Sequence, residues 1–535
     1  MVMYLPAPPQ VYGLDHTTQN ILDQAWQQWA AKLPRNIERL IYLDGKNKLK
    51  DLRISIPPEL LDDLNVVSGW AEKAVTEPAN RTIWEGMLDE DGNPDPFDLR
   101  HLLYRNRYAV EFPQGVRASM TYSCAFQSVT PGDVLSGEPE VLIMHHSAMW
   151  ATGLWNARLR ELSAGLLVGA VDVLGAPTEI MLLTPFETLV CRKMAGGWIL
   201  ADRIKNPLGR CGLELMPLAP DLDRPFGRAR VDRRVMSIVD RVVRAGSRLD
   251  VHSEAFSALK LFLLGADESA FTDEQGRTIP LWSYYMSRMN TLGVNEEGEL
   301  PKIEKISAES PEPHIATLRQ LASEFSGHTG VPLGSLGIAQ DNPESADAKN
   351  VAREDIMFMV KQQHTVYGHA KRRTFENAIM IRDRLTEPPR EIADLELLWR
   401  RPDHASDAAL ADAGMKQVTA AELQGTETGM RMIGMSEARI RQAVAEKRRM
   451  AAGTVLDRLT ADGALAEGEE VAGEAALRDA QIVKAQLDAL GVGVRAGADP
   501  TEVAEKVGLA GIKMTGAVPV SLRMPQDEAN DLEEK

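Results

Sequence analysis

The sequence predicts an α+β protein that contains one unusually long helix. Short apolar runs punctuated by Gly, Pro and Thr fill residues 116–202, which is the pattern of a sheet. Apolar residues recur at helical spacing in residues 17–40, 229–256 and 313–326. After residue 345 a helical pattern continues for about 40 residues, a rod on the order of 60 Å long. Such a rod suits a ring of subunits around a hole better than a small compact domain.

Length and composition set the next limits. The 535 residues are enough for about three or four domains, and 44% hydrophobic with 26% charged residues is typical of a soluble protein. The net charge of −17 argues against a histone-like or sequence-reading DNA binder, because such proteins carry a basic patch. It is compatible with a protein that lets DNA pass, since tight phosphate contacts need Lys and Arg. Residues 461–535 hold 7 basic and 15 acidic residues, net −8, which predicts a solvated acidic tail.

Cysteine usage and hydropathy predict a cytoplasmic, membrane-free protein. Cys124, Cys191 and Cys211 fit neither a disulfide framework nor a zinc knuckle, so we expect buried or free thiols. Residues 1–10 contain no basic run leading into an apolar run, which argues against a signal peptide. The longest apolar stretch, 165–186, is interrupted by charged residues and a proline. It predicts two strands around a turn and not a membrane span.

In chain order, a helix is predicted at residues 17–40 and another within residues 54–74. The sheet region follows. Its predicted strands are residues 140–144, 165–173, 178–183, 188–192 and 198–201. Two amphipathic helices, 229–256 and 313–326, then flank a small insert with predicted strands at 259–264 and 302–306.

The long helix is followed by Pro388 and Pro389, which end it. Residues 392–399 predict a strand that returns to the earlier sheet. Residues 435–450 predict a further helix with Ser436 as its N-cap.

The strong catalytic motifs are missing from the sequence. There is no Walker A phosphate loop, no G-x-S-x-G elbow and no H-E-x-x-H pair. His145 and His146 are adjacent on a strand and would point to opposite faces, so they make a poor metal site. His364 and His369 are five residues apart on a helix and fall on different faces. We therefore predict no enzyme activity, no metal and no cofactor.

Several short sequence segments, taken in order, resemble those of one protein family. They are Tyr42-Leu43-Asp44-Gly45, Ile56-Pro57-Pro58-Glu59-Leu60, Asn65-Val66-Val67-Ser68-Gly69-Trp70-Ala71, Asn206-Pro207-Leu208-Gly209-Arg210, Arg224-Pro225-Phe226-Gly227-Arg228, Leu263-Leu264-Gly265-Ala266-Asp267, Thr329-Gly330-Val331-Pro332-Leu333-Gly334-Ser335-Leu336-Gly337 and Asp341-Asn342-Pro343-Glu344-Ser345-Ala346. A segment near the end, Gly508 to Arg523, belongs to the same set. Over nearly its whole length the chain resembles the portal proteins of tailed double-stranded-DNA bacteriophages, of the type common in long-tailed actinobacterial phages.

The resemblance implies a portal fold, built of wing, stem, clip and crown, that assembles as a ring around an axial channel. The implied regions are the N-terminal helices and wing (1–227), stem helix 1 (228–256), clip (257–310), stem helix 2 (311–330), tunnel loop (331–345), long channel-side helix (346–385), return to the wing (386–417), crown (418–460) and acidic tail (461–535).

The tunnel loop implied by the resemblance carries polar and acidic residues. They are Gly334, Ser335, Gln340, Asp341, Asn342, Glu344, Ser345 and Asp347, and the first cation after them is Lys349. If the loop faces the channel, twelve copies of these acids would repel phosphate and lower friction on DNA. Ser345 also suits an N-cap, with Asp347 in the first turn, so an ordinary solvated cap explains the same residues.

The stem and the clip supply two further sets of candidate residues. Residues 228–254 carry seven Arg against four acids, net +3. We favour ion pairing between subunits over DNA contact for Arg233, Arg234, Arg241, Arg244 and Arg248, because a basic ring would grip phosphate. We also expect neighbouring subunits to share the apolar face of this helix. The resemblance places the clip against the packaging motor and later the adaptor, and the candidate contacts are Asp267, Glu268, Asp273, Glu274 and Arg277.

The resemblance thus implies a homo-oligomer, expected to be a dodecamer, at one capsid vertex of the virion, assembled in the host cytoplasm. It would conduct double-stranded DNA without sequence specificity during packaging and ejection. Its implied partners are the terminase large subunit, the head–tail adaptor, and the major capsid and scaffolding proteins, with no membrane partner. The alternatives are another head–tail connector or minor capsid protein, or a motor-associated enzyme.

Overall fold

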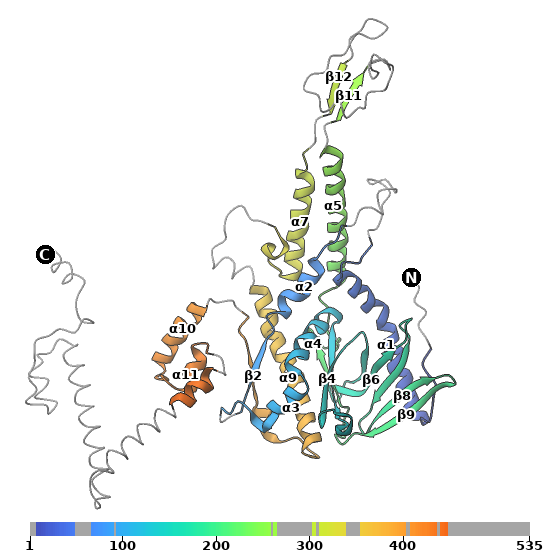
Figure 1. Cartoon of the computed structure of the whole chain (residues 1–535), viewed down its shortest axis with the longest axis vertical. Coiled ribbons are helices and arrows are strands. Elements are labelled where there is room, and N and C mark those ends of the chain that lie inside the picture. Colours follow the sequence, from blue (N-terminus) through green and yellow to red (C-terminus); the bar gives the residue numbers. More distant parts are fainter. Residues whose placement is uncertain are drawn as a thin grey trace, which may run out of the picture. The chain divides into compact units, whose positions relative to one another are not determined.

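A computed structural model gives the fold and describes most of the first 447 residues. The described stretches are residues 7–48, 66–89, 92–257, 260–264, 302–306, 310–338, 354–402, 407–435 and 439–447. The chain divides into two compact units, Met1–His404 (unit 1) and Ala405–Lys535 (unit 2). Figure 1 shows the elements of both units coloured along the sequence.

A six-stranded sheet with one covering helix forms the first layer of unit 1. Helix α1 (His16–Leu43) confirms the predicted N-terminal helix, and Asp15 caps it by accepting hydrogen bonds from two backbone amides. The sheet order is β1-β9-β8-β7-β6-β5, and α1 buries Trp26 and Trp29 against it. The strands are β1 (Val11–Tyr12), β5 (Ala151–Asn156), β6 (Glu161–Val171), β7 (Pro177–Leu183), β8 (Glu187–Met194) and β9 (Gly197–Lys205).

A second sheet of three strands lies at the centre of unit 1. Its order is β10 (Leu213–Pro217), β3 (Cys124–Pro131) and β4 (Val141–Ser147), all antiparallel. Helices α4 (Tyr108–Tyr122) and α9 (Glu354–Arg382) both pack on it. The long helix predicted at 346–385 is thus confirmed for residues 354–382; it ends three residues earlier than predicted, and residues 346–353 lie outside the described residues.

Helix α4 shows where local patterns mislead. The predicted strand region begins at residue 116, but Val116 lies inside this helix. Pro113 and Gly115 argue locally against a helix, since proline removes a backbone donor and glycine raises the backbone entropy cost. Burial overrides them: Tyr108, Phe112, Val116 and Met120 recur every four residues and are almost fully buried.

The sequence had suggested that the strand after the long helix joins the larger sheet. In the structure it does not. Strand β13 (Glu396–Trp399) pairs antiparallel with β2 (Trp84–Leu88) in a separate two-stranded sheet. The expectation failed because edge pairing depends on tertiary contacts that a local apolar run does not reveal. Short helices join these parts: α2 (Trp70–Ala79), η2 (Pro96–Asp98), α3 (Leu99–Arg105), η3 (Val134–Ser136) and η6 (Arg390–Asp394).

Two helices lie side by side and lead away from the sheets (Figure 1). They are α5 (Arg233–Ser257) and α7 (Glu312–Thr329), which confirm the two predicted amphipathic helices. Between them in sequence, β11 (Lys260–Leu264) and β12 (Lys302–Ile306) form an antiparallel pair, as expected for the insert. A 3-10 turn, η5 (Leu333–Leu336), follows α7.

The described part of unit 2 is helical. It contains α10 (Asp407–Ala420), α11 (Glu427–Met432) and a helical stretch at residues 439–447. The predicted start of the crown at residue 418 falls inside α10. The predicted helix 435–450 is confirmed for residues 439–447, and its expected N-cap, Ser436, lies outside the described residues.

Candidate functional site

The paired helices α5 and α7 are the predicted stem. Val235, Ile238, Val239 and Val242 of α5 are buried within the single chain, in one core with Phe325 of α7. The expectation that neighbouring copies must share this apolar face is therefore wrong for the first half of α5. The reason is that α2 and α9 also contribute to the same core, so α7 is not the only covering element.

The stem arginines have different environments. Arg233 and Arg234 are exposed at the start of α5. Arg241 forms two hydrogen bonds of 2.9 and 2.8 Å with the Glu324 carboxylate of α7, so its partner here is in the same chain. Arg244 and Arg248 are half-buried. Pairing of these arginines with a neighbouring copy stays a prediction.

Arg230, which lies just before α5, links α2 and α7. Its Nε donates to the Ala74 carbonyl of α2 at 2.9 Å, and its guanidinium also donates to the Thr329 carbonyl at the end of α7. The Ala74 carbonyl has no helical donor because the residue four positions later is Pro78. Burial lowers the pKa of Arg230 to about 10, a value at which it remains charged at neutral pH.

We expect Arg230→Met to lower the free energy of unfolding of unit 1 by about 2–4 kcal/mol, because two helix carbonyls lose their donor. All nine tryptophans lie before residue 405, so denaturation followed by tryptophan fluorescence reports on this unit. Adding Pro78→Ala should recover part of the loss, since the new alanine supplies a backbone N–H for the Ala74 carbonyl. Equal stability of Arg230→Met and wild type would refute this role.

The first half of the predicted tunnel loop packs on the core of unit 1. Val331 and Leu336 are buried, and the Ser335 hydroxyl hydrogen-bonds to Glu77 of α2. Gly330 ends α7 at a φ of +70°, and an added Cβ would lie 3.2 Å from Asp355 of α9. Gly334 is exposed. The other candidate loop residues lie outside the described residues: Gln340, Asp341, Asn342, Glu344, Ser345 and Asp347.

The candidate clip contacts also lie outside the described residues. This holds for Asp267, Glu268, Asp273, Glu274 and Arg277. Only the pairing of β11 with β12 is described in the insert.

A buried polar stripe on α9 was missed by the sequence analysis. Its members are Gln363, Tyr367, Lys371, Thr374 and Asn377, spaced four, four, three and three residues apart and all almost fully buried. Tyr367 donates to Ser119 of α4 at 3.0 Å, and Gln363 donates to the Pro217 carbonyl of β10 at 2.7 Å. The helical spacing of these polar residues was the available signal. The stripe fixes how α9 is rotated against the central sheet.

Lys371 lies in a box of aromatic rings. Its Nζ is 3.4 Å from the ring centre of Phe112, 3.9 Å from that of Trp84 and 4.3 Å from that of Tyr108. The same nitrogen donates to the Tyr108 hydroxyl at 3.2 Å. Burial lowers the pKa of Lys371 well below its usual value, while ring faces favour the cation. The box joins α9 to α4 and β2.

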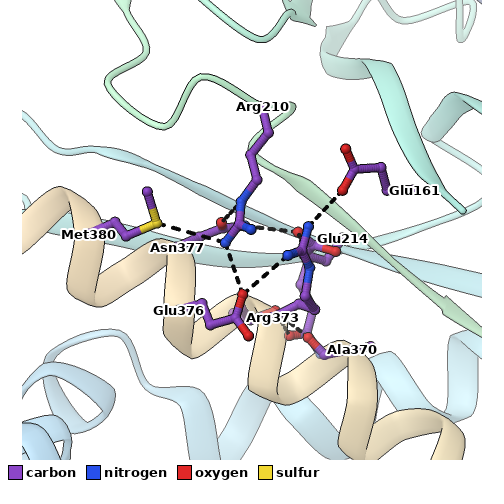
Figure 2. A network of polar contacts seen from close by, with 10 residues as sticks. Glu161, Arg210, Glu214, Ala370, Arg373, Glu376, Asn377 and Met380 are labelled. Carbon is purple, nitrogen blue, oxygen red and sulfur yellow. Dashed lines mark hydrogen bonds and ion pairs between the residues drawn. The ribbon is translucent and has the colours of Figure 1, made fainter. Parts of the chain in front are cut away.

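Two residues after Lys371, at Arg373, α9 carries an ion network, which Figure 2 shows. Arg373 lies 2.7 Å from the Glu161 carboxylate of β6, 3.2 Å from that of Glu376 and 3.8 Å from that of Glu214 on β10. Arg210, from the loop before β10, contacts the Glu376 carboxylate at 3.0 Å. Asn377 accepts from Arg210 and donates to Glu214 at 2.9 Å. Two sheets and α9 are thus held by two guanidinium groups and three carboxylates.

Glu214 makes this network sensitive to pH. Burial raises the pKa of Glu214 to about 7, although Arg373 and the Asn377 amide act in the opposite direction. Because the folded-state pKa lies above the ordinary value of 4.5, the folded state binds more protons between those two pH values. The contribution of Glu214 to stability is therefore fully present below about pH 4.5 and is lost as the pH rises to about 7.

We expect Glu214→Gln to remove this dependence. Relative to the variant, wild type should lose about 3 kcal/mol of stability between pH 4.5 and 7 and nothing further above that. Urea titrations of both proteins at several pH values, followed by tryptophan fluorescence, measure the difference. A difference that does not change with pH would show that Glu214 does not titrate in this range.

One serine–histidine contact has two of the residue types of a catalytic triad. Ser128 on β3 lies 2.8 Å from Nε2 of His146 on β4, but Ser128 is only 4% exposed. Burial lowers the pKa of His146 to about 4, and no carboxylate orients the ring among the described contacts. A hidden hydroxyl beside such a weak base is a structural contact between strands, not an activated nucleophile.

The cysteines, the possible metal ligands and the helices give no further functional site in the described part of the chain. Cys124, Cys191 and Cys211 are buried and free, as the sequence predicted. Among the described residues, no cluster of three or more His, Cys, Asp or Glu could hold a metal ion. None of the described helices is both long and apolar enough to cross a bilayer.

Comparison with known proteins identifies the family. The model of the family "Phage portal protein, SPP1 Gp6-like" matches residues 22–451. The portal protein of Mycobacterium phage L5 is 24% identical over 387 residues, which cover 70% of this chain and 77% of that protein. The portal protein of Mycobacterium phage D29 is 23% identical over the same coverage. A chain in the virion of a native gene transfer agent particle is 13% identical, with a TM-score of 0.36 over 75% of this chain and 93% of that chain. Because the family model covers most of its length, this chain belongs to the SPP1 Gp6-like phage portal proteins.

Proposed function

We propose that copies of this chain form a closed ring of twelve at one vertex of the capsid and that DNA passes through its axial hole. The observation that carries the proposal is the family match over residues 22–451. The long helix α9, locked to the sheets by the aromatic box and the ion network, supports it, because a channel wall must keep its shape under load. As a member of the phage portal protein family, the chain is a structural protein and not an enzyme.

The measured mass of the assembly tests whether twelve copies of the chain form a ring. Twelve copies of the 58.9 kDa chain have a mass of about 707 kDa. Native mass spectrometry of the purified full chain should give this mass, or that of a ring differing by one subunit. A chain that stays monomeric at all concentrations would contradict the proposal, and a stoichiometric complex with ATP would instead favour a motor-associated enzyme.

The proposed docking partners at the clip are the terminase large subunit during packaging and the head–tail adaptor afterwards. The insert between α5 and α7 supports this, since its described part is the β11–β12 pair, which lies between two long helices in the sequence (Figure 1). The proposal further includes contact of the ring with the major capsid and scaffolding proteins. Charge reversal at Asp267 and Glu268 should reduce terminase co-purification with the ring while the ring itself still forms.

The loop after η5 is proposed to face the DNA. Asp341 and Glu344 support this, because repeated carboxylates repel phosphate and the loop has no cation before Lys349. Asp341→Lys with Glu344→Lys should slow packaging and make the rate depend on salt. Unchanged packaging by an intact variant ring would place the loop away from the DNA.

A further inference from the structure

A cleft of about 1170 Å³ lies in unit 1 between α1 and the first turn of α5. The segment of residues 223–232 that leads into α5 forms part of its wall. Seven Lys and Arg side chains line the cleft against three Asp and Glu, a surplus of four positive charges. Because the whole chain has a net charge of −17, the cleft is a local cluster of positive charge in an acidic protein.

Most of the cations in the cleft have no ion-pair partner among the described residues. Lys32, Arg35, Arg224, Arg233 and Arg234 are exposed and have no ion pair in the described part of the structure. Asp232, an acid of the same cleft, is already engaged: it accepts hydrogen bonds from two backbone amides of α5 and contacts His328 at 3.1 Å.

Two of the arginines lie at the N-terminal end of a helix, where a positive charge is unfavourable. Arg233 and Arg234 occupy the first turn of α5, and the positive end of the helix dipole disfavours cations there by about 0.3–1 kcal/mol. Burial and the charge of Arg35 together lower the pKa of Arg39, at the same cleft, to about 10. Within one chain the cleft therefore holds mutually repelling charges, and an external acidic group would relieve them.

The size and lining of the cleft favour a protein segment as that group. Its volume is close to the range of small-ligand pockets, about 300–1,000 Å³, so it admits a few side chains and not a double helix. Pro225 and Phe226, both half-buried, add an apolar wall that suits side chains better than phosphates. A second copy of this chain can supply acidic side chains, because the chain without the four surplus positive charges of the cleft has a net charge of −21.

We propose that this cleft is a contact surface between copies of the chain and receives an acidic segment of the neighbouring copy. The inference rests on the proposed ring. In a ring every interface is heterologous, so each copy offers one surface to one neighbour and a different surface to the other. The basic cleft is then one half of the repeated contact. It gives Arg233 and Arg234 the inter-subunit role predicted for them and adds Lys32, Arg35 and Arg224.

The first test neutralises the cleft. In the full chain, Arg35→Gln, Arg224→Gln and Arg233→Gln are combined. The matched control combines Arg105→Gln, Arg158→Gln and Lys193→Gln, which are exposed cations outside the cleft. Analytical ultracentrifugation should show half-assembly of the cleft variant at a tenfold or higher concentration than wild type, with a weaker dependence on salt. The control should assemble like wild type, and tryptophan fluorescence should show that all three proteins fold.

The second test identifies what occupies the cleft. A ring is assembled from a mixture of ¹⁴N- and ¹⁵N-labelled chains and treated with a carbodiimide, which joins an amine directly to a carboxylate in contact. We expect Lys32 to be joined to an acidic peptide in mixed-isotope products. Cross-links from Lys32 in same-isotope products only would overturn the proposal.

The outcomes separate this proposal from the ring itself. If wild type forms no ring, the proposed function fails. If wild type, control and cleft variant form rings alike, only the cleft assignment fails. A cleft variant that assembles normally but loses affinity for DNA in a gel-shift assay would also overturn it, in favour of a nucleic-acid surface.

Discussion

Replacing Lys371 by glutamate is expected to prevent unit 1 from folding. The side chain is completely buried, and its Nζ lies within 4.3 Å of three ring centres. A carboxylate there would face the negative faces of the rings with no cation beside it. The cost of an uncompensated buried charge exceeds about 4 kcal/mol, a large part of the roughly 5–15 kcal/mol that stabilise a typical domain.

The matched substitutions make this expectation specific. Lys371→Met keeps the length and apolar stem of the side chain, so its stability should be within about 1 kcal/mol of wild type or above it. Lys361→Glu, on the exposed face of the same helix, should change stability by less than about 0.5 kcal/mol. Soluble expression and the tryptophan unfolding curve measure all three. A Lys371→Glu protein with the wild-type midpoint would show that the box is open to water.

The second large effect is expected for Arg373→Met. Among the described residues, this change removes the ion-pair partner of Glu161 and the guanidinium next to the buried Glu214. Glu376 keeps Arg210 at 3.0 Å. Breaking a buried ion pair by removing one partner costs about 3–5 kcal/mol, and we expect a loss near the lower end because Arg373 is 21% exposed.

A double-mutant cycle tests whether the network is the cause. Glu214→Gln in the Arg373→Met background should recover part of the loss, because no buried carboxylate is then left without its partner. The recovery should be larger at pH 8 than at pH 5, since Glu214 is protonated at the lower pH and its missing partner matters less there. Additive effects of the two changes at both pH values would mean that Arg373 acts independently of Glu214.

The fold could be predicted where one element shows its own periodicity. Helices α1, α5 and α7 bury one stripe and expose the other, so the apolar spacing located them. Strand β11 was located because it is a short apolar run, and β12 because Ile303 and Ile306 stand among charged residues in a short stretch that could pair with it. The pairing of β13 with β2 could not be predicted, because about 300 residues separate the two strands and neither pattern specifies a partner.

The candidate site was predicted less well than the fold. The arginine face of α5 was recognised, but the carboxylate that meets Arg241 is on α7, more than 80 residues later. Lys371 and Arg373 resemble ordinary surface residues of a long polar helix. Their partners come from α4, β2, β6 and β10, so only the tertiary structure reveals the box and the network.

Images of the purified full-length chain test the central claim most directly. Negative-stain microscopy should show closed rings with an axial hole and a narrower projection on one side, as expected for α5, α7 and the β11–β12 pair. Two-dimensional class averages should show about twelve-fold symmetry in end views. Isolated monomers, open filaments or closed particles without a hole would contradict the assignment of this chain as the wall of a DNA channel.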